Sequence, residues 1–495
     1  MSGILIAGYI LLILYILSLL YITVYCLLQF HLFYAARQVI LQYPSVSDSQ
    51  SSEKWPFVTI QLPVFNEQYV VGRLIDNIVC LDYPIDRFEI HILDDSTDET
   101  LKLSQQKADY FLNQGYNIRV FHRFDRTGYK AGALREALPE ARGEFIAIFD
   151  ADFLPDRNFL KQTIPHFSNP RTGVVQTRWD HINKDYSFIT RLQALQLNVH
   201  FFIEQTGRQE RNCFLQFNGT AGVWRKATIE DAGGWHADTL TEDLDLSYRA
   251  QLNGWKIKYL PDVGSPAELP AEMIGLKSQQ FRWMKGGAEN ARKLLPKVWK
   301  SQLPLMQKIH ATGHLLASSI FLFIFIAGTL SVPLVFLLRH IHFNPAILSI
   351  SLVGMLSVAI IYYKANIPTQ LQSERPFREV FRFLLLFPLF LALSMGLSLH
   401  NSVAVLEGYL GRKSAFVRTP KFNIRHIHDT FRNSRYQARR LPLTTVFEII
   451  FGFYFSGAVI AALYTGTHAF LFFHILLAIG FTTIAWYTIR HLRLK

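Results

Sequence analysis

The segment "FIAIFDADF", residues 145–153, is a run of apolar residues that ends in two carboxylates separated by one residue. Its nearly uninterrupted apolar character predicts a short strand that is buried on both faces. Asp150 and Asp152 fall where this strand would leave the sheet. A solvated turn is the simplest explanation for such a pair, so the neighbouring segments decide whether the two acids do more.

Further strands and helices alternate between residue 37 and about residue 300. The predicted strands are "FVTIQLP" (57–63), "FEIHIL" (88–93) and "IRVFHR" (118–123), and the predicted helices cover 67–80, 102–111 and 130–138. This alternation predicts an α/β domain whose parallel sheet is covered on both faces. Ligands of such sheets bind outside the carboxyl ends of the strands. Asp94 and Asp95 follow one strand end, so four carboxylates are expected at one edge.

This acidic edge predicts a site for Mg²⁺ or Mn²⁺ at Asp150 and Asp152. Both ions prefer oxygen ligands, and they commonly bind one or two carboxylates together with substrate phosphates. A bound ion would neutralise the charge of a departing diphosphate. None of the predicted strands is followed by a glycine-rich phosphate loop, GxGxxG or GxxxxGK[ST]. A phosphorylated ligand would therefore depend on the divalent cation.

Long apolar runs at both ends of the chain predict a membrane protein. Residues 4–30 contain no charge and, at about 1.5 Å per residue in a helix, are long enough to cross the ~30 Å hydrocarbon core. A cleaved signal peptide is the competing explanation, but the apolar run is too long and neither a basic segment nor a cleavage site is evident. Further runs cover 311–337, 346–363, 383–406, 445–464 and 469–489.

Charge and cysteine content favour a cytoplasmic side for the central domain. The net charge is +12, and residues 407–440 hold nine Lys or Arg but only two acids. Nucleic-acid binding could use such a segment, but its membrane flanks favour a cytoplasmic loop that follows the positive-inside bias. The cysteines Cys26, Cys80 and Cys213 have neither disulfide-framework nor metal-ligand spacing, which fits a reducing compartment.

This orientation constrains the membrane topology. Three crossings between residues 311 and 406 would put the basic loop on the wrong side of the membrane. We therefore expect one of the three runs not to be a full span, and 383–406 is the best candidate. It is interrupted by Pro388 and flanked by Arg378 and Arg382.

The segment "TEDLDLSYRAQLNGW" begins at Thr241 and predicts a helix with acids in its first turn. Thr241 is placed as the N-cap, followed by Glu242 and Asp243. Such acids commonly do no more than complement the helix dipole. In a catalytic interpretation Asp243 is a general base, but a helix N-terminus weakens a base, so burial would have to raise its pKa again.

The segment "QQFRWMKGG" places Gln279, Arg282 and Trp283 on one face of a helix, at i, i+3 and i+4. A guanidinium can bind phosphate in a bidentate manner, and an indole offers an apolar surface for a sugar ring. An amphipathic helix that lies on the membrane is the alternative.

Two shorter segments add candidate ligand contacts. Lys130 in "RTGYKAGAL" falls near the acidic edge, although a solvated lysine is the commoner case. The turn "FNGT" supplies Asn218, Gly219 and Thr220, and its glycine could admit a ligand close to the backbone.

The ordered set "DDS", "RTGYKAGAL", "DAD", "FNGT", "TED" and QxxRW resembles the processive membrane glycosyltransferases of family 2, the cellulose synthase superfamily. Within it, the chain looks most similar to the cellulose synthase-like mannan and glucomannan synthases and their bacterial relatives. The resemblance covers roughly residues 55–290. Beyond it, "FVRTPK" (416–421) looks like the gating loop that closes over the nucleotide sugar.

The resemblance implies a nucleotide-sugar-binding, GT-A-like domain and a role for each motif. It implies a nucleotide-diphosphate sugar, GDP-mannose or UDP-glucose, as donor, with Asp243 as the base and the metal ion at Asp150 and Asp152. The implied donor-binding residues are Asp95, Lys130, Arg282, Thr419 and Lys421. The implied acceptor-binding residues are Asn218, Gly219, Thr220, Glu242, Gln279 and Trp283. Direct displacement at the anomeric carbon would convert an α-linked donor into a β-linked product.

The chain also departs from the family pattern. Arg418 stands where the gating motif usually has an aliphatic residue, and Pro420 stiffens the loop. No cyclic-dinucleotide-binding domain precedes Lys495, so we expect a shorter relative rather than a regulated cellulose synthase.

These observations predict a multi-pass membrane enzyme with a cytoplasmic catalytic domain and no nucleic-acid partner. The expected regions are an N-terminal membrane helix (1–36), the transferase domain (37–277), interfacial helices (278–305), membrane helices (306–406), a basic loop (407–443) and a helical hairpin (444–495). The predicted activity is processive, inverting synthesis of a β-linked, β-1,4 mannan, glucomannan or glucan that is extruded through the bilayer. A non-processive transferase that glycosylates a lipid is the alternative. A non-catalytic glycan sensor or exporter would be expected to lack Asp150, Asp152 or Asp243, and none is missing.

Overall fold

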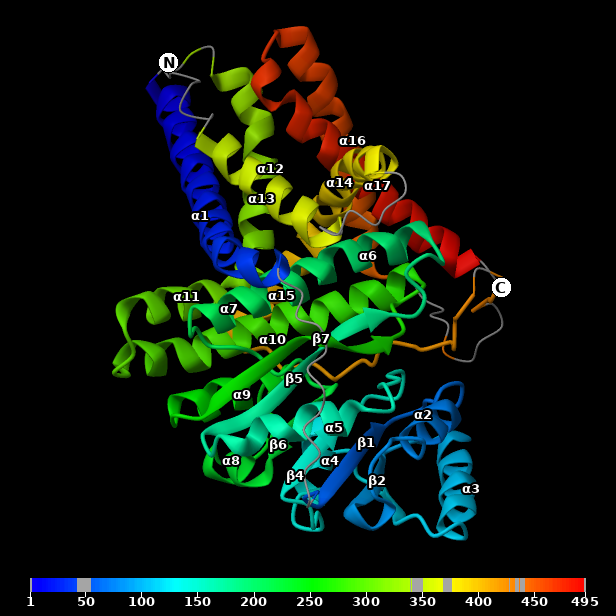
Figure 1. Ribbon diagram of the computed structural model, residues 1–495. Coiled ribbons are helices and arrows are strands. Elements are labelled where there is room, and N and C mark those ends of the chain that lie inside the picture. Colours follow the sequence, from blue (N-terminus) through cyan, green and yellow to red (C-terminus); the bar gives the residue numbers. More distant parts are fainter. Residues whose placement is uncertain are drawn as a thin grey trace.

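A seven-stranded sheet forms the lower half of the molecule in Figure 1, with apolar helices stacked above it. The computed structural model describes residues 2–41, 55–338, 340, 350–367, 376–426, 428–431, 436 and 441–493. The strands are β1 (Val58–Val64), β2 (Phe88–Asp94), β3 (Ile118–His122), β4 (Phe145–Ile148), β5 (Thr172–His181), β6 (Gly222–Arg225) and β7 (Lys256–Ala267). Their order across the sheet is β3-β2-β1-β4-β6-β5-β7.

The sheet is mostly parallel, as the alternation of strands and helices predicts. β1 pairs in parallel with β2 and β4, and β2 pairs in parallel with β3. β6 runs antiparallel between β4 and β5, and β5 pairs in parallel with β7. The sequence pattern did not predict the last three strands. β6 has only four residues, and β5 and β7 together mix charged residues, glycine and proline with apolar ones.

The quoted strand β4 is buried on both faces. Phe145 and Ala147 belong to the core on one side of the sheet, whereas Ile146 and Ile148 belong to the core on the other. Helices α2 (Val71–Ile78), α3 (Thr100–Leu112), α4 (Tyr129–Ala137), α5 (Phe159–Thr163), α8 (Lys226–Asp231) and α9 (Glu242–Leu252) surround the sheet. Short 3₁₀ turns η1 (Ile85–Arg87) and η2 (Ile164–Ser168) connect them. Burial on both sides explains why β4 carries no alternating polar residues.

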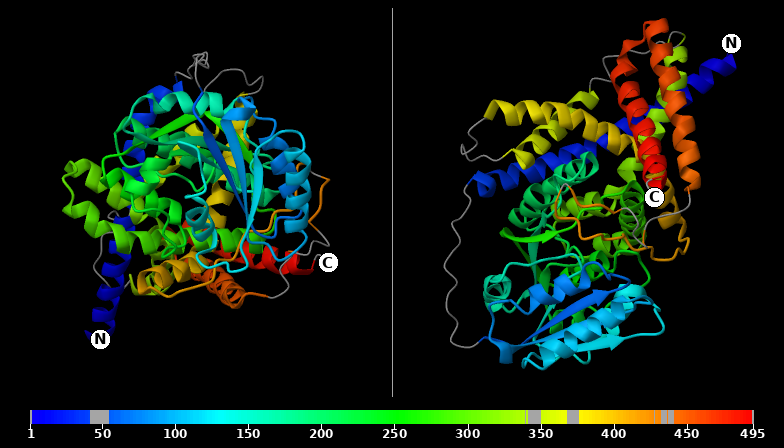
Figure 2. Two further views of the ribbon diagram at one scale, coloured as in Figure 1. Left: turned by 90° about the horizontal axis from the view of Figure 1, so that it is seen from below. Right: turned by 90° about the vertical axis from the view of Figure 1, so that its right-hand side faces the viewer.

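A layer of helices separates the sheet from the membrane-type helices (Figures 1 and 2). It contains α6 (Phe188–Asn198), the π-helix η3 (Val199–Gln205), α7 (Thr206–Glu210), α10 (Met273–Lys300), α11 (Leu305–Leu315) and α15 (Ser398–Leu410). α15 packs closely on α10, because a Cβ atom at Gly408 would lie 2.6 Å from the carbonyl oxygen of Lys285.

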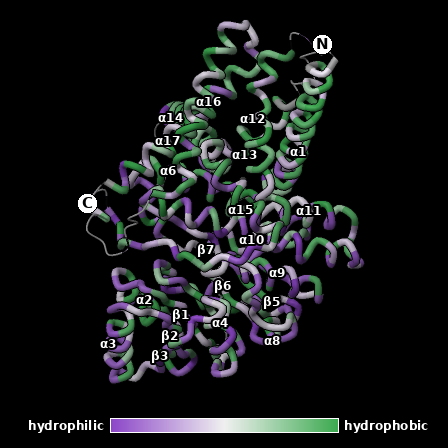
Figure 3. The backbone as a smooth tube through the Cα atoms, turned by 180° about the vertical axis from the view of Figure 1, so that it is seen from behind, coloured by the Kyte–Doolittle hydropathy of each residue, from purple (hydrophilic) through white to green (hydrophobic). Residues whose placement is uncertain are grey.

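The apolar helices are α1 (Ser2–Leu41), α12 (Ile320–Leu337), α13 (Ile350–Asn366), α14 (Pro376–Gly396), α16 (Leu443–Thr465) and α17 (Leu471–Arg493), with 3₁₀ turns η4 (Ala317–Ser319) and η6 (His468–Phe470). Figure 3 shows that hydrophobic residues are concentrated in this half of the molecule. Within the described residues, five helices are long and apolar enough to cross a membrane: Leu5–Val39, Ala317–Leu337, Phe377–Gly396, Leu443–Thr465 and His468–Leu492.

The structure corrects one membrane prediction. The run 383–406 is divided between α14 and α15, and the first of these is a candidate span by length and composition, contrary to the expectation that this run falls short. Pro388 lies inside α14 without ending it. Within the described residues, which stop short of 341–349 and 368–375, Leu352–Asn366 is a shorter apolar helix. Residues 346–349 of the predicted run 346–363 lie outside the described residues, as do residues 494–495 of the basic tail and parts of the basic loop.

Candidate active site

A cavity of about 970 Å³ begins at the carboxyl ends of β1, β2 and β4 and continues between the apolar helices. All of the predicted site residues except Thr220 line it: Asp95, Lys130, Asp150, Asp152, Asn218, Gly219, Glu242, Asp243, Gln279, Arg282, Trp283, Thr419 and Lys421. Thr220 is fully buried, and its hydroxyl accepts a hydrogen bond from the backbone N–H of Asp150 at 2.8 Å. Thr220 therefore supports the acidic turn and has no surface for the predicted contact with an acceptor.

Each carboxylate of the DxD motif is paired with a lysine. The Lys130 ammonium lies 2.5 Å from Asp150 Oδ1 and donates to the carbonyl oxygen of Gly219 at 2.9 Å. Burial alone would lower the pKa of Lys130, but the negative charges of Asp150 and Glu242 outweigh it and hold that pKa above its usual value.

The second carboxylate of the motif joins the gating-loop segment to the sheet. Asp152 Oδ2 accepts hydrogen bonds from the Lys421 ammonium at 2.7 Å and from the backbone N–H of Glu268 at 3.0 Å. Lys421 also donates to the carbonyl oxygen of Glu268 at 2.6 Å. Lys421, which lies 269 positions from Asp152 along the chain, therefore pairs with the predicted acidic edge.

The donor set of the DxD motif fits a hard divalent cation. Asp150 and Asp152 offer carboxylate oxygens, which Mg²⁺ and Mn²⁺ prefer. The two lysines show that this edge attracts positive charge, and the Asp150 side chain remains 38% exposed. A metal ion that carries a diphosphate can therefore reach it from the cavity.

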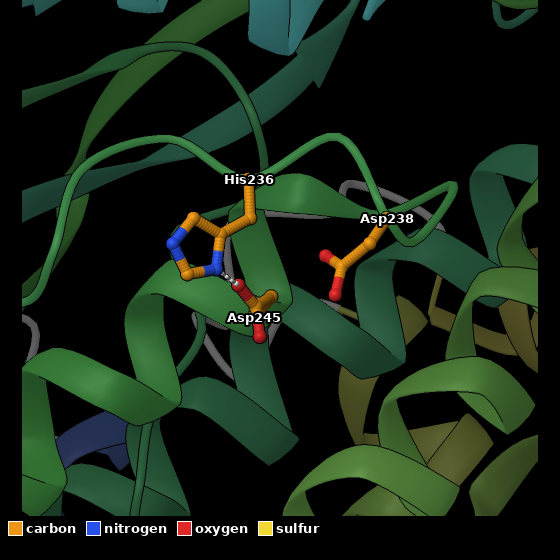
Figure 4. Close-up of side chains that lie close together, drawn as sticks. All are labelled: His236, Asp238 and Asp245. Carbon is orange, nitrogen blue, oxygen red and sulfur yellow. Dashed lines mark ion pairs between the residues drawn. The ribbon is translucent and has the colours of Figure 1, made fainter.

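A second group of possible metal ligands, His236, Asp238 and Asp245, lies at the N-terminal half of α9 (Figure 4). Lys293 lies 2.8 Å from a carboxylate oxygen of each aspartate, and Arg249 lies 2.8 Å from Asp245. These acids are paired with cations, as Asp150 and Asp152 are, but the group does not line the cavity, so a substrate diphosphate in the cavity would not bring a metal ion to it.

Asp243 stands at the N-terminus of α9, facing the turn that contains Gly219. Gly219 has a φ of +80°, and a Cβ atom there would lie 3.2 Å from Asp243 Oδ2, so the turn requires glycine for both conformation and space. Thr241 precedes the helix as predicted but makes no side-chain cap. Its hydroxyl instead accepts a hydrogen bond from Asn290 of α10 at 2.9 Å.

The helix N-terminus lowers the pKa of Asp243 and burial raises it, and in the folded protein the rise is larger. Burial, together with the negative charge of Glu242, raises the pKa of Asp243 to about 7. The N–H of Leu244, the charge of Lys130 and a hydrogen bond from Gln216 oppose this rise. Burial also raises the pKa of Glu242. Asp243 can therefore exchange a proton near neutral pH.

The segment 416–421 lies over the site and contacts the QxxRW helix α10. Arg282 donates to the hydroxyl of Thr419 at 2.8 Å, and its guanidinium lies 4.5 Å from the ring centroid of Phe416. Phe416 in turn stacks on Tyr129 at 5.6 Å. Arg282 therefore interacts with this segment through both a hydrogen bond and a cation–π contact.

Arg418, the departure from the family pattern, forms a tight contact of its own. Its guanidinium lies 2.5 Å from a carboxylate oxygen of Glu67 and 4.3 Å from the ring centroid of Tyr436. Burial raises the pKa of Glu67 to about 7, although the charge of Arg418 opposes the shift. The ion pair anchors the segment to the loop after β1.

Asp95 lines the cavity with its charge already balanced. Arg123 binds both of its oxygens, at 2.8 and 2.7 Å, and Arg126 approaches to 3.9 Å. This bidentate pair fixes the orientation of the carboxylate.

The sequence did not identify five further residues that line the cavity: Glu67, Arg126, His200, Glu204 and Glu268. Glu67 follows β1 and could have been found by the same strand-end rule that identified Asp95. His200 and Glu204 are polar residues at i, i+4 within the apolar stretch "NVHFFIEQ". No sequence signal marks Glu268.

Comparisons with known proteins agree with this geometry. Residues 56–286 match the protein-family model described as "Glycosyltransferase like family 2". "Glucomannan 4-beta-mannosyltransferase 1" of Cyamopsis tetragonoloba is 35% identical over 445 residues, which is 87% of this chain and 81% of that protein. "Glucomannan 4-beta-mannosyltransferase 2" of Arabidopsis thaliana is 41% identical over 256 residues, which is 51% of this chain and 48% of that protein.

A solved structure shares the fold. The mannosyltransferase PcManGT of Pyrobaculum calidifontis, in complex with GDP-Man and Mn²⁺, superposes with a TM-score of 0.53 at 19% identity. The superposition covers 81% of this chain and all of that one. The chain therefore belongs to glycosyltransferase family 2, in the cellulose synthase-like group that includes the glucomannan 4-β-mannosyltransferases, and it is a glycosyltransferase.

Proposed function

We propose that the protein transfers mannose from GDP-mannose to a growing β-1,4-linked glycan and passes the product through the membrane. One observation supports this most directly: the same cavity is lined by the acidic sheet edge and by apolar helices from both ends of the chain. The names of the plant relatives and the GDP-mannose in PcManGT favour mannose as the transferred sugar.

In the donor half of the cavity, Asp150 and Asp152 would hold Mg²⁺ or Mn²⁺. When bound, the ion neutralises negative charge on the diphosphate of the leaving nucleotide. The remaining donor contacts come from Asp95, Lys130, Arg282, Thr419 and Lys421. The positive groups of Lys130, Arg282 and Lys421 line the same cavity, where the negative charge of the leaving group would develop.

In the reaction, the acceptor hydroxyl oxygen attacks the anomeric carbon while the bond from that carbon to the diphosphate breaks. Asp243 accepts the hydroxyl proton, which its pKa of about 7 suits. Attack opposite the leaving group turns an α-linked donor into a β-linked product. Gln279 and Trp283 of α10, with Glu242 and the Asn218–Gly219 turn, bind the acceptor.

The membrane part of the cavity supports a path for the product. Aromatic side chains from five apolar helices line it, including Tyr15 of α1, Phe321 of α12, Tyr362 of α13, Phe390 of α14 and Phe473 of α17. A polar glycan does not cross a bilayer unaided, and stacking on aromatic rings would let it slide without strong binding. A retained chain end would favour repeated addition, which is processive synthesis.

Product sizing tests the proposal. Purified protein in lipid nanodiscs receives labelled GDP-mannose, UDP-glucose or UDP-N-acetylglucosamine with Mn²⁺. We expect a long polymer from GDP-mannose that an endo-β-1,4-mannanase degrades. A single labelled glycolipid without polymer would contradict processive synthesis, and incorporation from UDP-glucose alone would contradict the assigned donor.

A further inference from the structure

A polar cluster, His200, Glu204 and Asn218, lines the cavity in a region with no assigned role apart from Asn218. His200 Nδ1 lies 2.9 Å from Glu204 Oε2, and His200 Nε2 lies 2.9 Å from Asn218 Oδ1. The side chains of His200 and Glu204 are 24% and 19% exposed, so both are partly buried but remain accessible from the cavity. The π-helix η3 carries the first two, and such helices occur frequently at functional sites.

Hydrogen bonds and apolar packing hold the cluster in place. The backbone N–H of Asn218 donates to Gln176 Oε1 at 2.9 Å, and Gln205 Nε2 donates to the carbonyl oxygen of Gln216 at 2.8 Å. On its other side, η3 packs through Val199 and Ile203 against Ile361 of α13 and two phenylalanines of α1. The polar groups therefore hold their positions without a ligand.

The positions of the protons in the cluster determine which hydrogen-bonding groups remain for a ligand. The Glu204 carboxylate only accepts, so His200 Nδ1 carries the proton in their contact. Burial alone would raise the pKa of Glu204, but the hydrogen bond and charge of His200, with the charge of Arg208, hold it below its usual value. One end of the Asn218 amide is bound to the imidazole, whichever way the amide is turned. The other end, Asn218 Nδ2, makes only a long hydrogen bond of 3.5 Å to the carbonyl oxygen of Gln216, so a sugar hydroxyl can compete for it.

Gly219 connects the cluster to Asp243, because it follows Asn218 in the chain and faces the Asp243 carboxylate. Gly219 accepts a hydrogen bond from Lys130, and a Cβ atom on it would lie 3.2 Å from Asp243 Oδ2. The cavity continues to Tyr25 and Gln29 of α1. A sugar whose hydroxyl reaches Asp243 therefore lies beside Asn218, with the rest of its chain directed toward the membrane helices.

We propose that His200, Glu204 and Asn218 form a hydroxyl-binding subsite for the end of the acceptor glycan, in which the His200–Glu204 pair positions the Asn218 amide. This inference rests on the proposed function and adds two positioning residues to it. The ligand is a neutral, hydroxyl-rich sugar chain, because the ionised Glu204 repels a phosphate or an anionic lipid headgroup. Asn218 touches the sugar, and the other two act through it.

The test separates acceptor binding from donor binding in the full-length protein. Binding of β-1,4-mannohexaose and of GDP with Mn²⁺ is measured by calorimetry, alongside KM for both substrates, for wild type, His200→Ala, Glu204→Gln and Asn218→Ala. We expect the mannohexaose Kd and acceptor KM to rise roughly tenfold, the loss expected for one or two hydrogen bonds. Nucleotide binding and donor KM stay within about twofold of wild type.

Two further variants exclude a merely structural effect. His200→Gln retains a group that can bond Asn218, so it should restore much of the acceptor affinity that His200→Ala loses. Glu210→Gln makes the same chemical change as Glu204→Gln on an exposed acid of α7 and should alter neither binding constant. Because His200 acts through Asn218, the double variant His200→Ala, Asn218→Ala should bind mannohexaose about as well as Asn218→Ala alone.

The possible failures are distinguishable. Variants that bind mannohexaose as tightly as wild type, while the wild type forms polymer, would overturn the subsite and leave the proposed function intact. Equal losses of nucleotide and acceptor binding would show a structural role and overturn the subsite as well. A wild-type protein that neither binds mannohexaose nor transfers mannose would overturn both.

Discussion

A buried ion pair between the QxxRW helix and a membrane-type helix gives a quantitative test of how the two halves of the protein are joined. Lys277 of α10 lies 2.6 Å from Glu448 of α16, and their side chains are only 2% and 0% exposed. Thr445 supplies one more contact to the ammonium, at 3.4 Å. His400 of α15 contacts the Lys277 carbonyl oxygen at 2.9 Å. Three helices therefore meet at Lys277.

Removing one partner leaves the other charge buried. Such a change costs about 3–5 kcal/mol, whereas replacing both partners by apolar residues of similar volume is commonly neutral or stabilising. We expect Lys277→Met and Glu448→Gln to lower the unfolding temperature by several degrees, and Lys277→Met combined with Glu448→Leu to restore it. Burial lowers the pKa of Lys277 while Glu448 opposes that shift, so the amine left by Glu448→Gln loses its proton more readily. We therefore expect Glu448→Gln to be the milder single change.

Thermal unfolding of the detergent-purified variants, followed by intrinsic tryptophan fluorescence, measures this order. The pair between Lys107 and Asp76 is the matched control: it has the same 2.6 Å separation, but its side chains are 36% and 50% exposed. Lys107→Met should change stability by less than about 1 kcal/mol. Single variants at Lys277 and Glu448 that unfold with the wild type, or a double variant no better than the singles, would refute the reasoning.

Further predictions concern the active site. Asp243→Asn should reduce mannosyl transfer by about 10²–10⁴-fold, the contribution of a general base, while GDP and Mn²⁺ still bind; turnover near the wild-type rate would remove Asp243 from that role. Because the ionised form of Asp243 accepts the proton and its pKa is about 7, the wild-type transfer rate should rise with pH through about 7 and then level off; a flat profile between pH 6 and 8 would contradict this. Arg418→Val removes the ion pair to Glu67 and should make the segment 416–421 roughly tenfold more sensitive to limited trypsin digestion. An unchanged digestion rate would show that the ion pair does not anchor the segment. Gly219→Ala should slow transfer without unfolding the protein, because its Cβ displaces the Asp243 carboxylate; full activity in this variant would mean that the turn tolerates the shift.

Much of the catalytic domain was predictable because its signals are local. The apolar strand Phe145–Ile148 can only be buried on both faces, and the acids that follow it must lie at the sheet edge. The same rule pointed to Asp95, and helical spacing pointed to Arg282 and Trp283; all three line the cavity. Thr220 was misassigned because its sequence position in the turn says nothing about which way its side chain points. It is buried behind the acidic edge.

The sequence by itself determined the α/β alternation, the apolar helices at both ends and the acidic strand ends, because each follows from the period and composition of a short segment. Only the tertiary structure decided that Lys421 reaches Asp152, that Arg418 pairs with Glu67 and that His200 holds Asn218, since these partners are far apart along the chain or depend on the exact turn of a π-helix. It also decided the pKa of Asp243. Burial and neighbouring charge set that value, and both arise only when the α9 terminus, the glycine turn and Lys130 are packed together.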